Sequence, residues 1–241
     1  MRSILTFVLM MATSCGAVAQ EIDWGKVDQA LGRKPMVTGD VHRYGFPRTD
    51  LKVTLDGVPV KPAFALGGWL AFKPIHGEAM VMGDLVLLEA EINPVLTRLI
   101  DGGLVITAVH NHLLRANPAT FYMHVGGHGD PVKMAAVIHD ALAQSGTPLT
   151  SAPAGAAPDL KLDTAQLDDT IGAKGQANGG VYQFAVPRRA PVTEGNMVLD
   201  PPGPLGAAQA INFQPLDDGR TAITSTLFPK FVSHLLHPLD T

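Results

Sequence analysis

Charged side chains are scarce in this 241-residue chain: Asp, Glu, Lys and Arg make up 17% of it, and the formal net charge is −4. This weakly acidic balance excludes a basic nucleic-acid binder, because such proteins need a surplus of Lys and Arg to neutralise phosphates. Hydrophobic residues, at 46%, are numerous enough to form a core, which excludes the highly charged disordered class. Glycine and proline number 25 and 19, and they favour turns and short strands over an all-α fold.

Cysteine occurs once, at Cys15, so no disulfide can form within the chain. No stretch reaches the roughly 20 consecutive apolar residues that a transmembrane helix requires. The apolar run over residues 4–12 is shorter, follows Arg2 and precedes the small-residue sequence Ala17-Val18-Ala19, a pattern that predicts a signal peptide over residues 1–19. Alternatively, residues 12–15 resemble a lipoprotein box that would place a lipid anchor at Cys15. Both interpretations predict export, to the periplasm or beyond the cell.

A shift of 140 residues aligns residues 22–62 with residues 162–202 without a gap, and the identical pairs include Asp28/Asp168 and Lys34/Lys174. Self-similarity at a fixed offset predicts a duplicated unit. Residues 145–158 are rich in Pro and Ala and predict an exposed linker between the copies. We therefore divide the chain into a signal peptide (1–19), a first repeat (20–144), a linker (145–162) and a partial second repeat (163–241). The histidine-rich part of the first repeat has no counterpart in the second.

The first repeat has the pattern of an α+β fold, with an antiparallel sheet, helices packed on one face and a β-α-β-β-α core. Apolar residues recur with helical or alternating spacing between Gly, Pro and Asn punctuation. The predicted segments are a helix over 23–31, short strands over 41–46, 52–55 and 69–72, a strand over 79–88, a helix that begins at Asn93-Pro94 and ends at Gly102, strands over 104–114 and 120–125, and a helix that Asp130 caps and that runs to Leu142.

Histidines gather in the last part of this repeat. His110 and His112 lie two residues apart on the strand over 104–114, so they share a face with one another and with Leu104, Ile106 and Ala108. If that strand pairs with residues 120–125 as a hairpin, His110 opposes His124 and His112 opposes Tyr122. Directly opposed Cβ atoms lie about 4.5–5.5 Å apart, so three imidazoles would converge. Imidazole binds divalent transition metals well, and zinc is one candidate.

Several other residues are candidates for chemistry around this cluster. Glu89 and Glu91 follow the strand over 79–88 and are candidate general bases for a metal-dependent hydrolase. His128, in a predicted glycine-rich turn over 126–129, and Asn111 are candidates for binding another ligand, such as an anion at the following helix N-terminus. A third hypothesis is that the histidines only satisfy polar contacts in a non-metal binding or structural module. Motifs of the types G-x-S-x-G, G-x-x-x-x-G-K-[ST] and G-x-G-x-x-G are absent.

Four segments resemble the LppY/LpqO family of bacterial envelope proteins, which is built around a domain of uncharacterised function. They are residues 79–87 (AMVMGDLVL), 91–95 (EINPV), 107–112 (TAVHNH) and 123–127 (MHVGG). The resemblance implies a lipoprotein or secreted protein with the domain in tandem, and it implies no particular activity. The sequence therefore predicts an exported α+β protein that binds a divalent transition metal in a binding or sensing role. Its partner would be an unidentified small molecule or envelope component.

Overall fold

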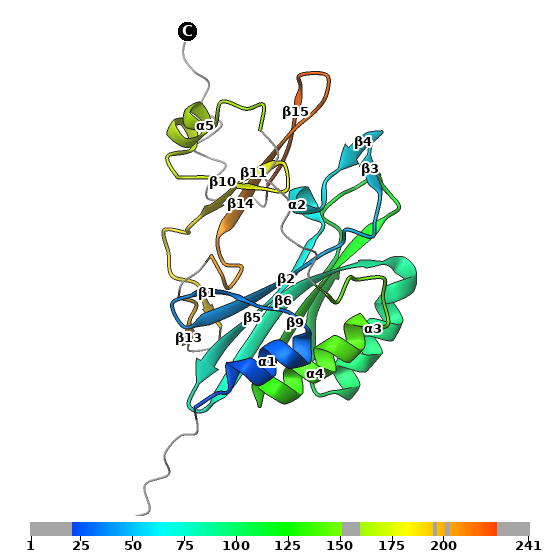
Figure 1. Ribbon diagram of the computed structural model, residues 1–241, viewed down its shortest axis with the longest axis vertical. Coiled ribbons are helices and arrows are strands. Elements are labelled where there is room, and N and C mark those ends of the chain that lie inside the picture. The colour runs from blue at the N-terminus through cyan, green and yellow to red at the C-terminus, as the bar shows by residue number, and fades with distance from the viewer. Residues whose placement is uncertain (1–20, 151–159, 195–196, 201–202, 226–241) are drawn as a thin grey trace, which may run out of the picture.

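The computed structural model describes residues 21–150, 160–194, 197–200 and 203–225 (Figure 1). The predicted signal peptide and Cys15 lie outside these residues. None of the helices among the described residues is long and apolar enough to cross a membrane.

The first repeat is built on a six-stranded antiparallel sheet, in which each strand pairs with its neighbour by a backbone ladder. In spatial order the strands are β1 (Met36–Thr38), β2 (Val41–Pro47), β5 (Gly67–Ile75), β6 (Glu78–Leu88), β9 (Thr120–Gly129) and β7 (Val105–His110). A smaller sheet has the order β4 (Val58–Val60), β3 (Val53–Leu55) and β8 (Ala116–Asn117), and the short helix α2 (Pro62–Ala65) follows β4.

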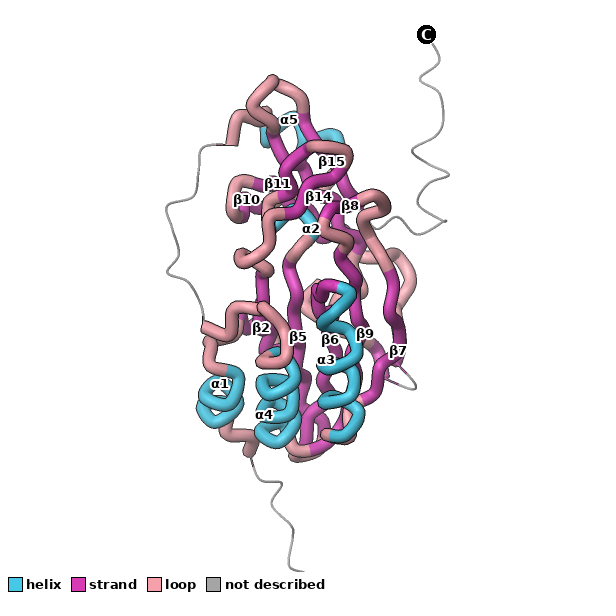
Figure 2. Tube along the Cα trace, turned by 90° about the vertical axis from the view of Figure 1, so that its right-hand side faces the viewer, coloured by secondary structure: helices cyan, strands magenta, loops and turns pink. Residues whose placement is uncertain are grey.

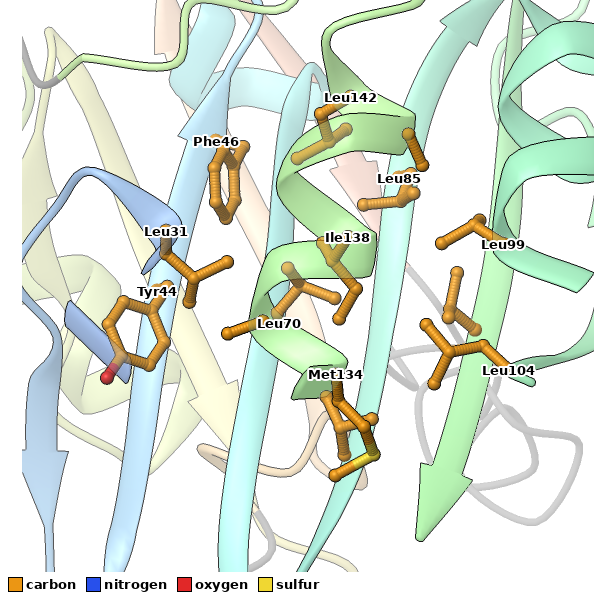
Figure 3. Close-up of a cluster of buried hydrophobic side chains, with 14 of the residues drawn as sticks. Leu31, Tyr44, Phe46, Leu70, Leu85, Leu99, Leu104, Met134, Ile138 and Leu142 are labelled. Atoms are coloured by element: carbon orange, nitrogen blue, oxygen red, sulfur yellow. The ribbon is translucent and has the colours of Figure 1, made fainter. Parts of the chain in front are cut away.

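Three helices lie side by side on one face of the large sheet (Figure 2): α1 (Trp24–Leu31), α4 (Pro131–Leu142) and α3 (Glu89–Asp101). The side chain of Asp130 accepts the backbone N–H of Val132 and so caps α4, as the sequence predicts. Alternate residues of β2, β5, β6 and β9 point into the layer between sheet and helices, where Leu70, Leu85 and Ile138 are fully buried (Figure 3). The predicted α+β class, with helices on one face of an antiparallel sheet, is confirmed.

Three of the differences from the predicted element boundaries bear on the candidate site. Helix α3 begins at Glu89 rather than at Asn93, because the Glu91 carboxylate accepts the backbone N–H of Leu88 and closes the first turn earlier, which leaves Pro94 inside the helix. The strand predicted over 104–114 ends at His110. Residues 126–129 do not form the predicted turn, because their backbone continues the ladder between β9 and β6 up to Gly129.

The second repeat reproduces the first half of the first one. Helix α5 (Thr164–Ile171) precedes a sheet with the order β10 (Gln176–Asn178), β11 (Val181–Val186), β14 (Gln209–Pro215) and β15 (Thr221–Ser225). These elements correspond to α1, β1, β2, β5 and β6. The repeated Asp and Lys form the same ion pair in both copies, with Lys34 Nζ 2.9 Å from Asp28 and Lys174 Nζ 3.0 Å from Asp168.

The two repeats cover each other's sheets. The hairpin of β12 (Thr193–Glu194) and β13 (Met197–Val198) leads to Leu199 and Leu205, which pack on the side of the six-stranded sheet that the helices leave open. In the other direction, Gln183 of β11 donates a hydrogen bond to the Ala63 carbonyl oxygen of α2 at 2.6 Å. Residues 145–150, predicted as linker, also pack on the first repeat: Thr147 is buried.

Candidate metal centre

The candidate centre lies on the sheet face opposite the helices. In β6 and β9, Leu85, Met123 and Val125 point into the helix-covered core, so the alternating residues Asp84 and His124 point the other way. The buried Val86 and Tyr122 lie on one side of this row, under α2, and Met80 lies on the other, under Leu199 and Leu205. Asp84 and His124, which lie between these two apolar contacts, remain partly accessible to solvent.

Each histidine is positioned by a different local feature. His124 stands in the middle of β9, directly opposite Asp84 of β6. His110 is the last residue of β7 and opposes Tyr122. His112 lies two residues beyond the strand, in a segment that the buried side chain of Leu113 anchors.

The predicted register of the hairpin was wrong, but the three histidines still lie close together. His110 opposes Tyr122 rather than His124, and His124 opposes Ala108, and a β-bulge at residue 107 shifts the pairing of β7 with β9 by one further residue beyond these pairs. The bulge also reverses the facing of the strand: Ile106 packs against the helix-covered core, whereas His110 points to the opposite face. Ile106 and His110 therefore do not share a face, contrary to simple alternation.

The three imidazole rings converge as the sequence predicts. The Nε2 atoms of His110 and His124 are 3.0 Å apart, and one ring nitrogen from each of His110, His112 and His124 lies within 4.8 Å of the other two. The ring of Tyr122 packs against those of His110 and His112, with its centroid 4.1 Å from that of His112 and the two planes nearly perpendicular. Two atoms that each bind one ion at about 2.0–2.2 Å are at most about 4.4 Å apart, so small ring rotations bring all three within reach of one ion.

Asp84 is a site residue that the sequence analysis missed. Its Oδ2 atom lies 3.8 Å from Nε2 of His112 and 3.8 Å from Nε2 of His124. Its Oδ1 atom is buried and has no hydrogen-bond partner among the described residues. The available signal was a single carboxylate inside the apolar strand over 79–88, but its relation to His124 depends on the pairing of β6 with β9, which the sequence pattern did not supply.

The electrostatic surroundings keep the centre suited to metal binding. Burial lowers the pKa of His124, and the neighbouring His110 and His112 lower it further, although Asp84 opposes them. At neutral pH His124 is therefore the neutral imidazole, which is the form that binds metals. Burial also lowers the pKa of Arg43 to about 10, against the opposing charge of Asp84. The Arg43 guanidinium lies 3.8 Å above the Trp69 ring, beside the Asp84 row.

The structure places the two predicted bases outside this cluster. Glu91 accepts hydrogen bonds from Arg48 Nη1 at 2.7 Å and from the backbone N–H groups of Leu88 and Gly146. Its carboxylate therefore has a structural role. Glu89 is exposed in the first turn of α3. Among the described His, Cys, Asp and Glu residues, the cluster that can hold an ion within that spacing consists of His110, His112 and His124.

The two further ligand-binding candidates also stand apart from the imidazoles. His128 is exposed near the end of β9, where it pairs with Met80 of β6. The Asn111 side chain donates a hydrogen bond to the Thr120 carbonyl oxygen at 3.0 Å, which ties the end of β7 to the start of β9. This hydrogen bond thus holds the backbone between His110 and His112 in place.

Comparison with known proteins gives a family and no function. No curated protein and no solved structure matches the chain. A family described as Domain of Unknown Function (DUF1259) matches it twice, over residues 25–144 and over residues 165–228. The two matches coincide with the two structural repeats, and the first contains all three histidines and Asp84. Because the matches together span more than half of its length, the chain belongs to the family of Domain of Unknown Function (DUF1259).

Proposed function

We propose that this protein is exported and binds one divalent transition metal through His110, His112 and His124, in a binding or sensing role in the envelope. The observation that carries the proposal is the convergence of the three rings from two strands and a loop, with Nε2 of His110 3.0 Å from Nε2 of His124. Zinc is the first candidate because imidazole is among its preferred ligands. The sequence resemblance to the LppY/LpqO family supports the envelope location.

The contacts of the three rings separate this proposal from a purely structural role. Core histidines are normally held by hydrogen bonds to carbonyl or carboxylate oxygens. Here the close contact of His110 is with a second imidazole nitrogen, and the nearest carboxylate oxygen to His112 or His124 is at 3.8 Å, beyond hydrogen-bond range. A hydrogen bond between His110 and His124 involves only two of the rings, whereas a shared cation accounts for the convergence of all three.

A metal-dependent hydrolase is the second candidate function, and the accessibility of the cluster favours it. The His124 and His112 side chains are 43% and 30% exposed, so a bound ion would keep a solvent-facing position. Neither Glu89 nor Glu91 lies in the cluster, so a hydrolase would have to draw its base from elsewhere. We therefore rank metal binding first.

Elemental analysis of the purified protein tests the metal proposal. The protein is stripped with a chelator, incubated with zinc, manganese or copper, dialysed and analysed for bound metal. The test variant is the double variant His110→Ala/His124→Ala, and the matched control is His128→Ala, which removes an exposed histidine of β9 outside the cluster. Circular dichroism verifies that each variant is folded.

We expect about one equivalent of metal in the parent and in the control, and none in the folded double variant. No metal in the parent with any of the three ions would overturn the proposal and leave a non-metal binding module. The export part is tested separately by the mass of the protein recovered from the envelope fraction. Loss of residues 1–19, or a lipidated N-terminal Cys15, supports export, and an uncleaved chain confined to the cytoplasm contradicts it.

A further inference from the structure

We propose that Asp84 is the fourth protein ligand of this centre, which would make it a site of three imidazoles and one carboxylate. This inference rests on the proposed metal-binding function. It begins from the unusual place of the side chain: Asp84 lies in the middle of β6, an inner strand of the sheet, between Met82 and Val86 on the same face. A carboxylate in such a position loses hydration, and folding retains it only where another group compensates.

No group among the described residues provides that compensation. The Asp84 side chain is 17% exposed, its Oδ1 atom is buried without a hydrogen-bond partner, and no described donor reaches Oδ2. The nearest ring nitrogens to its Oδ2 atom are Nε2 of His112 and Nε2 of His124, each 3.8 Å away. Arg43 adds only a longer-range attraction. The carboxylate is thus placed among imidazoles without being bound by them.

The direction of approach favours a ligand over a supporting residue. A carboxylate that orients a metal-binding histidine accepts a hydrogen bond from the ring nitrogen that does not bind the metal. Asp84 instead faces Nε2 of His124, the nitrogen that also faces His110. The same oxygen is equally close to Nε2 of His112. Oδ2 of Asp84 therefore lies beside two of the three converging rings, on the side of the nitrogens that face one another in His110 and His124.

The distances permit this coordination. Ligand atoms about 2.0–2.2 Å from one ion are separated by about 3 Å at right angles and by about 4.4 Å at most. The 3.0 Å separation of the His110 and His124 nitrogens and the two 3.8 Å separations to Asp84 all fall within that range. A shift of less than about 1 Å in the Asp84 side chain brings its oxygen to the usual ligand spacing.

A carboxylate ligand changes which ions the site prefers. Imidazole suits zinc, copper, nickel and iron, whereas carboxylate oxygen also suits harder ions such as Mn²⁺. The negative charge of Asp84 further balances half of the charge of a divalent ion. We therefore expect the carboxylate to matter more for manganese than for zinc.

The experiment compares the parent with Asp84→Asn, which keeps the shape of the side chain and removes its charge. Asp101→Asn is the matched control, because it makes the same chemical change at an exposed residue at the end of α3. Zinc and manganese affinities are measured by competition with a chromophoric chelator. The visible spectrum of the cobalt(II)-loaded protein reports the ligand set, and thermal melts of the metal-free proteins report stability.

We expect Asp84→Asn to weaken zinc binding at least as much as the loss of a residue that only supports a metal ligand, which is about 10- to 100-fold, and to weaken manganese binding more. The cobalt spectrum should change. The metal-free variant should melt at the same temperature as the parent or above it, because an uncompensated carboxylate has been removed. Asp101→Asn should match the parent in every measurement.

Two results would overturn the inference, and they differ from failure of the proposed function. If Asp84→Asn binds zinc and manganese as the parent does, with the same cobalt spectrum, Asp84 is not a ligand although the histidines are. If the metal-free variant melts well below the parent and the affinities are unchanged, Asp84 has a structural role only. If the parent itself binds no metal, the proposed function fails and this inference fails with it.

Discussion

Arg48 offers the sharpest test of how the first repeat is held together. Its side chain is 1% exposed and connects three elements: it follows β2, donates a hydrogen bond to the Val86 carbonyl oxygen of β6 at 2.7 Å, and pairs with Glu91 of α3 through both terminal nitrogens. It also pairs with Asp50 at 2.8 Å. Replacing it with methionine, Arg48→Met, keeps much of the apolar volume and removes every one of these bonds.

The expected cost follows from the groups that lose their partner. Breaking a buried ion pair by removal of one member costs about 3–5 kcal/mol, because the other charge stays buried. Glu91 is 13% exposed and keeps the N–H donors of Leu88 and Gly146, which places the expected cost near the lower end, about 3 kcal/mol. The double variant Arg48→Met/Glu91→Gln should cost less than the sum of the two single changes, because both remove the same interaction.

Urea denaturation followed by circular dichroism measures this loss. The control is Arg115→Met, which removes the exposed ion pair with Asp56, whose side chains are 69% and 55% exposed. Exposed pairs contribute little to stability, so the control should unfold close to the parent. If Arg48→Met destabilises the protein no more than Arg115→Met does, the assignment of Arg48 as a buried link between sheet and helix is refuted.

Two further predictions concern the same unit. Burial raises the pKa of Glu91, but the hydrogen bonds from Arg48 and from backbone N–H groups outweigh burial and lower the pKa overall. The ionised Glu91 carboxylate therefore stabilises the fold above the usual glutamate pKa, and this stabilisation is lost as the pH falls through the lowered pKa. Acid titration of unfolding should therefore show a steeper loss below about pH 4 in the parent than in Glu91→Gln, and equal slopes would contradict it. Gly83→Ala should cost about 1–3 kcal/mol, because its Cβ would lie 2.5 Å from the backbone oxygen of Trp69. Gly45→Ala, whose Cβ meets nothing within 4 Å, is the control, and equal melting temperatures for the two variants would refute the packing argument.

The parts of the fold that follow from local pattern were predictable from the sequence. Asp23 and Gly32 mark the two ends of α1, and Asp130 marks the start of α4, because capping is decided by a few neighbouring residues. The repeat was predictable because an offset of 140 residues is visible without any structure. The start of α3 was missed, because Glu91 closes the first turn on the Leu88 N–H although Leu88 is not one of the usual capping residues.

The candidate site was predicted in its histidines and missed in its carboxylate for the same physical reason. His110, His112 and His124 lie close in sequence, so a local hairpin is enough to suggest that they meet. The β-bulge at residue 107, which turns His110 away from the helix-covered core, leaves no mark in the composition of β7. Asp84 joins the histidines through the long-range pairing of β6 with β9, whose register a sequence pattern does not specify.

The most direct test of the central claim is a crystal structure of the zinc-loaded protein, with an anomalous difference map recorded on both sides of the zinc absorption edge. The account predicts one edge-dependent peak about 2.0–2.2 Å from Nε2 of His110, His112 and His124, with Asp84 Oδ2 at a similar distance. The absence of a peak among these residues, or a peak that lies only elsewhere on the protein, would contradict the account.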